Sequence, residues 1–89
     1  MADISTPVAL VTGSALRLGR HMICKLHQAG YNVIVHYHQS QTAAQSLVAE
    51  LNQQRANSAA MVSANLTDDT AIAALAQDVL ACFGRLDVL

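Results

Sequence analysis

The sequence predicts an α/β fold, because short runs of apolar or β-branched residues alternate with longer segments of helical periodicity. Three such pairs follow one another between residues 8 and 83. The first run, residues 8–11 (VALV), is apolar at every position, as expected of a strand buried on both faces of a parallel sheet. We therefore predict a doubly wound, Rossmann-type parallel sheet. The chain would hold its N-terminal βαβαβα portion and the start of a fourth strand.

The first helix is expected over residues 17–29, with Gly30 in the position where a left-handed residue commonly closes a helix. Its apolar residues recur at the spacing of an amphipathic helix: Leu18, Met22, Ile23 and Leu26. Residues 32–37 (NVIVHY) are rich in β-branched side chains and predict the second strand. A polar helix is expected over residues 42–55, with one apolar face made of Ala43, Ala44, Leu47, Val48 and Leu51.

A weaker third strand is expected over residues 58–64. Thr67 is expected to cap the helix that follows, whose first turn holds Asp68 and Asp69, where the helix dipole favours negative charge. This helix carries a broad apolar stripe and ends at Gly84; the stripe comprises Ile72, Leu75, Ala76, Val79, Leu80 and Phe83.

Residues 86–89 (LDVL) are expected to begin a fourth strand. Because the sequence stops inside this apolar run, we expect residues 1–89 to be the N-terminal portion of a single domain in a longer protein. The predicted strand order is 3-2-1-4, with the turn over residues 13–19 at the carboxyl end of the first strand. The edge of that strand would be incompletely covered.

Composition narrows the classes of function. The 89 residues are 53% hydrophobic and 12% charged, which predicts a globular chain rather than a disordered one. A formal net charge of −1 without a basic cluster gives no support to nucleic-acid binding. No apolar stretch approaches the roughly 20 residues that span a bilayer. Cys24 and Cys82 are interpreted as small buried residues without a disulfide, which makes the cytoplasm the expected location.

The segment VTGSALRLGR, residues 11–20, combines two glycines with the end of a buried strand. Glycines at such a turn let the backbone approach a pyrophosphate at the N-terminus of the next helix. The strict G-x-G-x-x-G spacing is absent, and Arg20 and His21 after the second glycine exclude a G-x-x-x-x-G-K-[ST] loop. On the glycines alone, a phosphate-binding loop and a strand-to-helix turn that only needs small residues both stay open.

Residues 12–19 (TGSALRLG) resemble the T-G-x-x-x-G-x-G turn of the short-chain dehydrogenase/reductases, with Arg17 in place of the middle glycine. Together with HYHQS at residues 36–40, this spelling is similar to the pteridine reductase branch. The resemblance implies an NADPH-dependent reductase of pterins, a homo-oligomer (a tetramer), with Gly13, Ser14, Leu18 and Gly19 among its cofactor contacts.

By the same resemblance, Arg17 should face the cofactor pyrophosphate and is also a candidate contact of the pterin substrate. An arginine brings a permanent cation with five hydrogen-bond donors to bound phosphates. The alternative is an arginine that points to solvent, but a cation at a helix start is disfavoured by the helix dipole.

The second strand predicts a preference for NADPH. An NAD site usually has an acidic residue near the end of this strand, whereas this chain has Tyr37, His38, Gln39 and Ser40, which admit a 2′-phosphate. Because the family often has arginine where Gln39 stands, we expect the preference to be modest. His36 and His38 share one strand face, but no third metal ligand lies within sequence reach, so a metal site is not favoured.

Asn65 and Leu66 occupy the place where the family contacts adenine, with a simple turn as the alternative for Asn65. The family's catalytic tyrosine has a lysine four residues later. Here Val35 and Gln41 follow Tyr31 and Tyr37 at that spacing, so we expect the catalytic residues to lie outside these 89 residues. The remaining alternatives are another reductase of the superfamily, such as one acting on 3-oxoacyl thioesters, and a nucleotide-binding module without catalysis.

Overall fold

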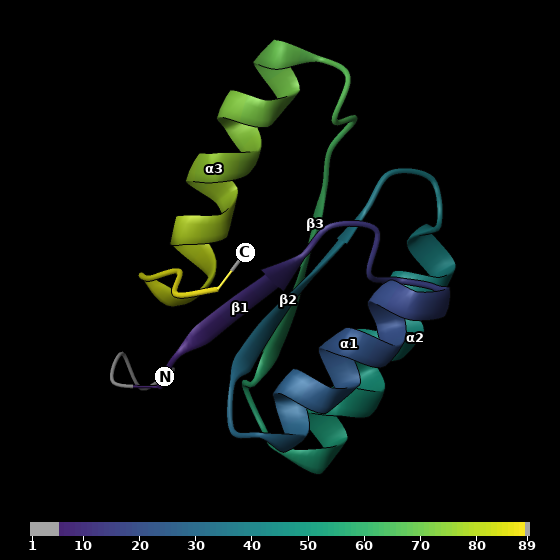
Figure 1. Cartoon of the computed structure of the whole chain (residues 1–89), viewed down its shortest axis with the longest axis vertical. Helices are drawn as coiled ribbons and strands as arrows, with labels where there is room; N and C mark the ends of the chain where they lie inside the picture. Colours follow the sequence, from purple (N-terminus) through teal and green to yellow (C-terminus); the bar gives the residue numbers. More distant parts are fainter. Residues whose placement is uncertain (1–5, 89) are drawn as a thin grey trace.

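The computed structural model describes residues 6–88 as three parallel strands, each followed by a helix (Figure 1). The elements agree with the predicted ones to within one residue at each end; they are β1 (Val8–Val11), α1 (Arg17–Gln28), β2 (Asn32–Tyr37), α2 (Gln41–Gln54), β3 (Ala59–Ser63) and α3 (Asp69–Phe83). No helix in this part of the chain is both long enough and apolar enough to cross a membrane.

The strands are ordered β1-β2-β3, and both pairings are parallel. Val88 forms an isolated parallel bridge with β1 and accepts a hydrogen bond of 2.8 Å from the Leu10 N–H. The Pro7 carbonyl instead accepts from Asn32 of β2, at 2.9 Å, so Val88 lies along the opposite edge of β1. The predicted order 3-2-1-4 is confirmed for residues 6–88, where the fourth strand is this single bridge. Leu89 lies outside the described residues.

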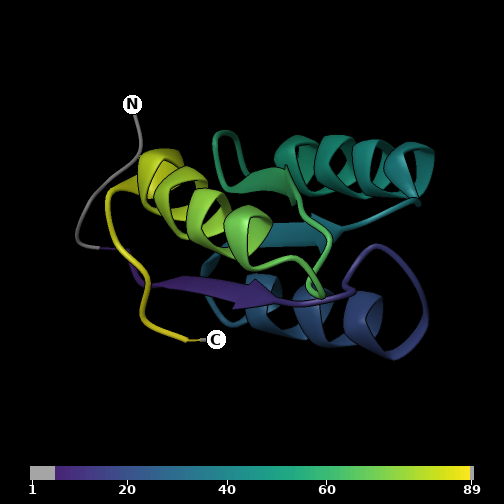
Figure 2. The ribbon, with the colours of Figure 1, turned by 90° about the horizontal axis from the view of Figure 1, so that it is seen from above.

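The helices cover both faces of the sheet, with α1 and α2 on one face and α3 on the other (Figure 2). Side chains of β2 alternate between the two layers. The core under α1 and α2 consists of Ala15, Ile23, Val33, Val35, Ala44, Leu47, Leu51 and Ala59. The core under α3 consists of Val8, Leu10, Ile34, Val62, Ala64, Leu75, Val79 and Phe83. The chain is therefore a doubly wound parallel α/β unit of the Rossmann type.

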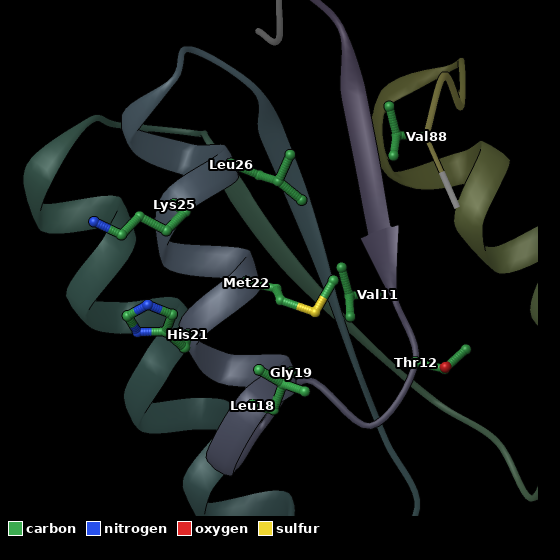
Figure 3. Close-up of a pocket in the computed structure, with 9 residues that line it drawn as sticks. All are labelled: Val11, Thr12, Leu18, Gly19, His21, Met22, Lys25, Leu26 and Val88. Atoms are coloured by element: carbon green, nitrogen blue, oxygen red, sulfur yellow. The ribbon is translucent and has the colours of Figure 1, made fainter.

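Helix α1 does not pack on the sheet through all of the apolar residues predicted to form its buried face. Ile23 and His27 are buried, whereas Leu18 and Met22 are 72% and 46% exposed. Because residues at i and i+4 share one side of a helix, Leu18, Met22 and Leu26 form a flank that extends past β1. This flank borders a groove of about 790 Å³ beside Val11 and Val88 (Figure 3), into which Met22 and Leu26 point.

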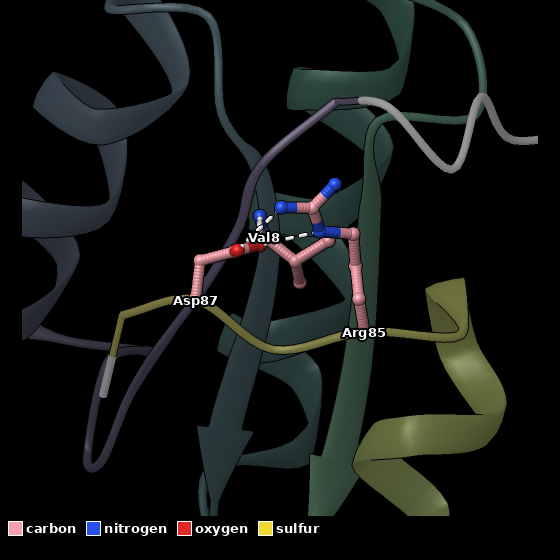
Figure 4. Close-up of polar contacts among 3 residues, drawn as sticks. All are labelled: Val8, Arg85 and Asp87. Carbon is pink, nitrogen blue, oxygen red and sulfur yellow. Dashed lines mark hydrogen bonds and ion pairs between the residues drawn. The ribbon is translucent and has the colours of Figure 1, made fainter.

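The segment after α3 is attached to β1 by a carboxylate. Asp87 Oδ2 accepts hydrogen bonds from the Val8 N–H and from Arg85 Nε, both at 2.8 Å (Figure 4). These two donors, first Arg85 and then Val8, hold the pKa of Asp87 below its ordinary value. The carboxylate thereby places residues 85–88 along the free edge of β1.

Two predictions about α3 and the cysteines need correction. Asp68, not Thr67, caps α3, because its carboxylate accepts from the N–H groups of Thr70 (2.9 Å) and Ala71 (3.3 Å). Cys24 and Cys82 are free, but they are only half-buried, because each packs against a hydrophobic core as a partly buried neighbour rather than inside it.

A buried polar cluster joins α1 to the start of β3. His27 is 2% exposed, and its Nε2 lies 2.7 Å from Ser58 Oγ. The Ser58 hydroxyl donates to the Arg55 carbonyl, so His27 Nε2 carries the proton and donates to Ser58. Arg55 also donates to the carbonyls of His27 and Tyr31, at the end of α1. Burial, and then the cation of Arg55, lower the pKa of His27.

We predict that acid destabilises the chain through His27. The folded state favours neutral His27, so the unfolded chain takes up this proton at a higher pH, near the ordinary value of about 6.5. The free energy of unfolding is therefore retained above that pH and falls as the pH drops below it, towards the folded-state pKa. Urea unfolding at about pH 7.5 and about pH 5.5 measures this loss.

His27→Gln keeps a donor towards Ser58 and removes the titration, so it should shrink the loss of stability between the two pH values. His38→Gln changes an exposed histidine and serves as the matched control, with the wild-type loss expected. An equal loss in His27→Gln and wild type would contradict this assignment.

Candidate functional site

The carboxyl ends of the parallel strands lie at one edge of the sheet, where the segments after β1, β2 and β3 come together (Figure 1). The segment after β1 contains two residues with positive φ, Gly13 at +63° and Arg17 at +58°. Glycine adopts this left-handed conformation freely, whereas an L side chain there costs about 1–2 kcal/mol. The turn therefore imposes strain on Arg17 and none on Gly13.

Gly19 is required for a different reason. A Cβ atom at this position would lie 2.6 Å from the Gly13 carbonyl oxygen and 2.8 Å from Ser14 Cα. The missing side chain thus lets the first turn of α1 rest directly on the backbone of the loop. At Gly13 an added Cβ would meet nothing within 4 Å, so only its φ angle favours glycine.

His36, at the end of β2, holds the glycine loop, residues 13–19, in place. The Gly13 N–H donates to His36 Nδ1 at 2.9 Å, and His36 Nε2 lies 3.0 Å from the Ala64 carbonyl beyond β3. Because Nδ1 accepts, the ring proton resides on Nε2 and is donated to Ala64. The ring is 3% exposed. This role was not predicted from the sequence, where the one signal was a polar side chain directly after the apolar residues 33–35.

Ser14 reinforces the same attachment. Its N–H donates to the His36 carbonyl at 3.0 Å, and its Oγ accepts from the His36 N–H at 3.1 Å. Ser14 has no exposed surface. Ser14 is therefore a buried support beneath the glycine loop, and its predicted contact with the cofactor stays a prediction.

A crevice of about 240 Å³ lies between the glycine loop and the segment after β2. It brings together five of the predicted site residues with three others; the lining is Gly13, Ala15, Leu16, His36, Tyr37, His38, Gln39 and Ser40. Among residues 6–88, no acidic residue lines it. Gly19 and Leu18 instead line the larger groove on the flank of α1 (Figure 3).

Two of the three helices that begin at this edge, α1 and α2, have uncapped N-termini, whereas α3 is capped by Asp68. Leu16 precedes α1 and Ser40 precedes α2, and neither makes a side-chain capping hydrogen bond. Neither helix has an acidic residue in its first turn. The unpaired N–H groups and the helix dipoles make both positions favourable for anions. Arg17, exposed at the start of α1, adds a full positive charge.

Asn65 and Leu66 lie after β3 and line neither the crevice nor the groove. Asn65 Oδ1 accepts hydrogen bonds from the Thr67 N–H (3.0 Å) and hydroxyl (2.7 Å). This arrangement is an Asx turn, and the predicted contact of Asn65 with adenine stays a prediction. Leu66 is 42% exposed.

His36 in β2 and His38 just after it do not converge on a common ligand. His36 is buried with both ring nitrogens engaged, whereas His38 is exposed at the crevice. Within residues 6–88, no group of three or more histidine, cysteine or acidic side chains could hold a metal ion.

Comparison with known proteins identifies the architecture. A family model described as short chain dehydrogenase matches residues 7–89, nearly the whole chain. This chain belongs to the short-chain dehydrogenase family. Members of the family are oxidoreductases that bind NAD(P)H, and the loop, crevice and open helix N-termini lie where a Rossmann-type sheet binds its dinucleotide.

Three curated relatives illustrate the range of reactions. Pteridine reductase 1 of Leishmania tarentolae is 50% identical over 64 residues, covering 72% of this chain and 22% of the relative. A 3-oxoacyl-[acyl-carrier-protein] reductase of Staphylococcus aureus is 38% identical over 84 residues, covering 94% and 34%. Tetrahydroxynaphthalene reductase of Pyricularia oryzae is 34% identical over 88 residues, covering 99% and 31%. The chain thus spans about a third or less of the length of each relative.

We predict that the two loop glycines respond differently to a methyl group. Gly19→Ala gains helix propensity of about 1 kcal/mol, but its Cβ would displace the loop backbone, so we expect a net loss of about 2 kcal/mol. Gly13→Ala meets only its unfavourable φ angle and should lose about 1 kcal/mol. Urea unfolding of both variants gives the comparison, and a larger loss for Gly13→Ala would contradict the proposed close packing.

Proposed function

We propose that this chain binds the adenosine and pyrophosphate portions of NADPH within a short-chain reductase that reduces a pterin or dihydropterin. The observation that carries this proposal is the acid-free crevice between the glycine loop and the segment after β2. It joins two uncapped helix N-termini, each suited to one phosphate group of the cofactor.

The pyrophosphate would lie at the start of α1. The N–H groups of Gly13 and Ser14 are occupied by His36, so the donors left to a ligand begin at Ala15. Arg17 stands among these donors in a left-handed conformation that opposes its side chain. A strained residue kept at such a position supports a functional role, because glycine would fit the same turn without strain.

The 2′-phosphate would lie at the start of α2. His38 and Gln39 are exposed there, and Ser40 directly precedes the helix. Glu50, the nearest acidic residue in the sequence, is in an ion pair with Arg20 at 3.1 Å and lines neither side of the crevice. The phosphate therefore meets neutral donors and a helix N-terminus, without a repelling carboxylate.

The substrate class is supported less directly. Arg17 and the 50% identity to a pteridine reductase favour a pterin. The second candidate, a 3-oxoacyl thioester, is favoured by the 38% identity that extends over 94% of the chain. Turnover of biopterin, folate and an acetoacetyl thioester by the full-length gene product tests the choice. Faster reduction of the thioester than of any pterin would overturn the pterin proposal.

We predict a modest preference for NADPH over NADH that is determined by the residues directly after β2. Gln39→Arg adds a charged fork at the 2′-phosphate, so NADPH should bind about tenfold tighter while NADH is nearly unchanged. His38→Asp should reverse the preference, because a carboxylate repels the phosphate and can accept from a ribose hydroxyl. Dissociation constants for both cofactors check this, and equal affinities in the unmodified protein would contradict it.

We also predict that Arg17 lowers the stability of the fold and raises its affinity for NADPH. Arg17→Gly relieves the left-handed strain, so the free energy of unfolding should stay constant or rise by about 1 kcal/mol. Affinity for NADPH should fall about tenfold through loss of a charge-assisted contact. Arg20→Ala, on the same helix, is the matched control with unchanged affinity expected. A lower free energy of unfolding together with unchanged NADPH affinity in Arg17→Gly would contradict this prediction.

A further inference from the structure

We propose that His36 is a positioning residue of the cofactor site: its neutral imidazole sets the glycine loop so that the amides after Ser14 face the dinucleotide. This inference rests on the proposed dinucleotide binding and goes beyond it. His36 lines the crevice, but both of its ring nitrogens bond to backbone groups of the protein. Its contribution lies in the two backbone groups that it connects, one on each side of β2.

The geometry assigns a distinct task to each ring nitrogen. Nδ1 accepts from the Gly13 N–H at 2.9 Å, and Nε2–H donates to the Ala64 carbonyl at 3.0 Å. The first bond fixes the loop after β1, and the second fixes the segment after β3. One buried ring thereby sets the spacing of the three segments that surround the crevice.

The backbone of His36 completes the arrangement. Its carbonyl accepts from the Ser14 N–H, and its N–H donates to Ser14 Oγ. The first two amides of the loop thus point into the protein. Gly13 has positive φ, which turns the chain there, and the amides that bond to His36 end at Ser14. Without the Nδ1 contact, the Gly13 N–H would be free to turn, and the loop would lose its defined orientation.

Only one protonation state of the ring fits both contacts. A lone pair must be present on Nδ1, because the Gly13 N–H is a donor, and the proton must be on Nε2, because the Ala64 carbonyl is an acceptor. Asparagine offers a partial replacement, since its Oδ1 is attached to Cγ as Nδ1 is in histidine. It can accept from Gly13 but is too short to reach Ala64.

Three variants of the full-length protein separate positioning from general stability. His36→Leu has a similar volume and removes both ring contacts. His36→Asn keeps an acceptor for Gly13. His27→Leu is the matched control, because it removes another buried histidine, at the end of α1 away from the crevice. For each, we would measure the NADPH dissociation constant, the thermal unfolding midpoint, and hydrogen exchange at the Gly13 amide.

We expect NADPH to bind about tenfold more weakly to His36→Leu, the change expected from loss of the Gly13 hydrogen bond that orients the loop. His36→Asn keeps this bond and should bind NADPH within about threefold of wild type. His27→Leu should lower the unfolding midpoint and leave the dissociation constant unchanged. The Gly13 amide should exchange slowly in wild type and His36→Asn, and rapidly in His36→Leu. The ¹⁵N shifts of the His36 ring should report a proton on Nε2.

Equal weakening of NADPH binding in His36→Leu and His27→Leu would overturn the inference, because the effect would then be one of stability alone. Unchanged binding in His36→Leu, or the same loss in His36→Asn as in His36→Leu, would overturn it too. If wild type binds neither NADPH nor NADH, the proposed function fails by itself. Exchange at Gly13 still decides the positioning role in that case, and rapid exchange in wild type would refute it.

Discussion

The central strand β2 is the constraint on which the other elements depend. It pairs with a parallel strand on each edge and contacts a helix layer on each face, so five of its six residues are buried. A strand in this environment must be apolar on both faces, which residues 33–35 satisfy. The polar exception, His36, comes where the strand leaves the core, and it converts the end of the sheet into an attachment point for the glycine loop.

Polar side chains are thus placed at both ends of an apolar sheet. His36 links the segments at the carboxyl edge, and His27 with Ser58 links α1 to the amino end of β3. Both rings are buried, and each donates through Nε2 to an acceptor. Buried polar groups of this kind are favourable only when fully paired, and no buried side-chain nitrogen or oxygen in the described part of the chain lacks a partner.

The glycine loop combines residues required by backbone geometry with one that supplies a positive charge. Gly13 and Gly19 satisfy backbone geometry, the first through its φ angle and the second through close contact. Arg17, like Gly13, has left-handed geometry, and it stands where the short-chain dehydrogenase turn that it resembles has glycine. The positive φ angle explains why the family has glycine at this position, since an L side chain is strained there. It also shows what the arginine contributes, an exposed cation beside an uncapped helix N-terminus.

The sequence by itself determined the elements and their order, because these depend on local signals. The apolar run of β1, the β-branched run of β2 and the glycine after each of α1 and α3 fix where strands and helices begin and end. The place of the loop at the carboxyl end of β1 follows from that order and from the rule for parallel sheets. Much of the crevice, from Gly13 to Ser40, was therefore predictable.

Only the tertiary structure decided which side each residue faces and which partner it has. Leu18 and Met22 match the helical pattern but extend past β1, because α1 is rotated to bury Ile23 and His27. Asp68 caps α3 in place of Thr67, whose hydroxyl is engaged by Asn65. The contact of His36 with Gly13 joins residues 23 positions apart. No periodicity within one element reports such a contact, since it arises only when the parallel strands bring their ends together.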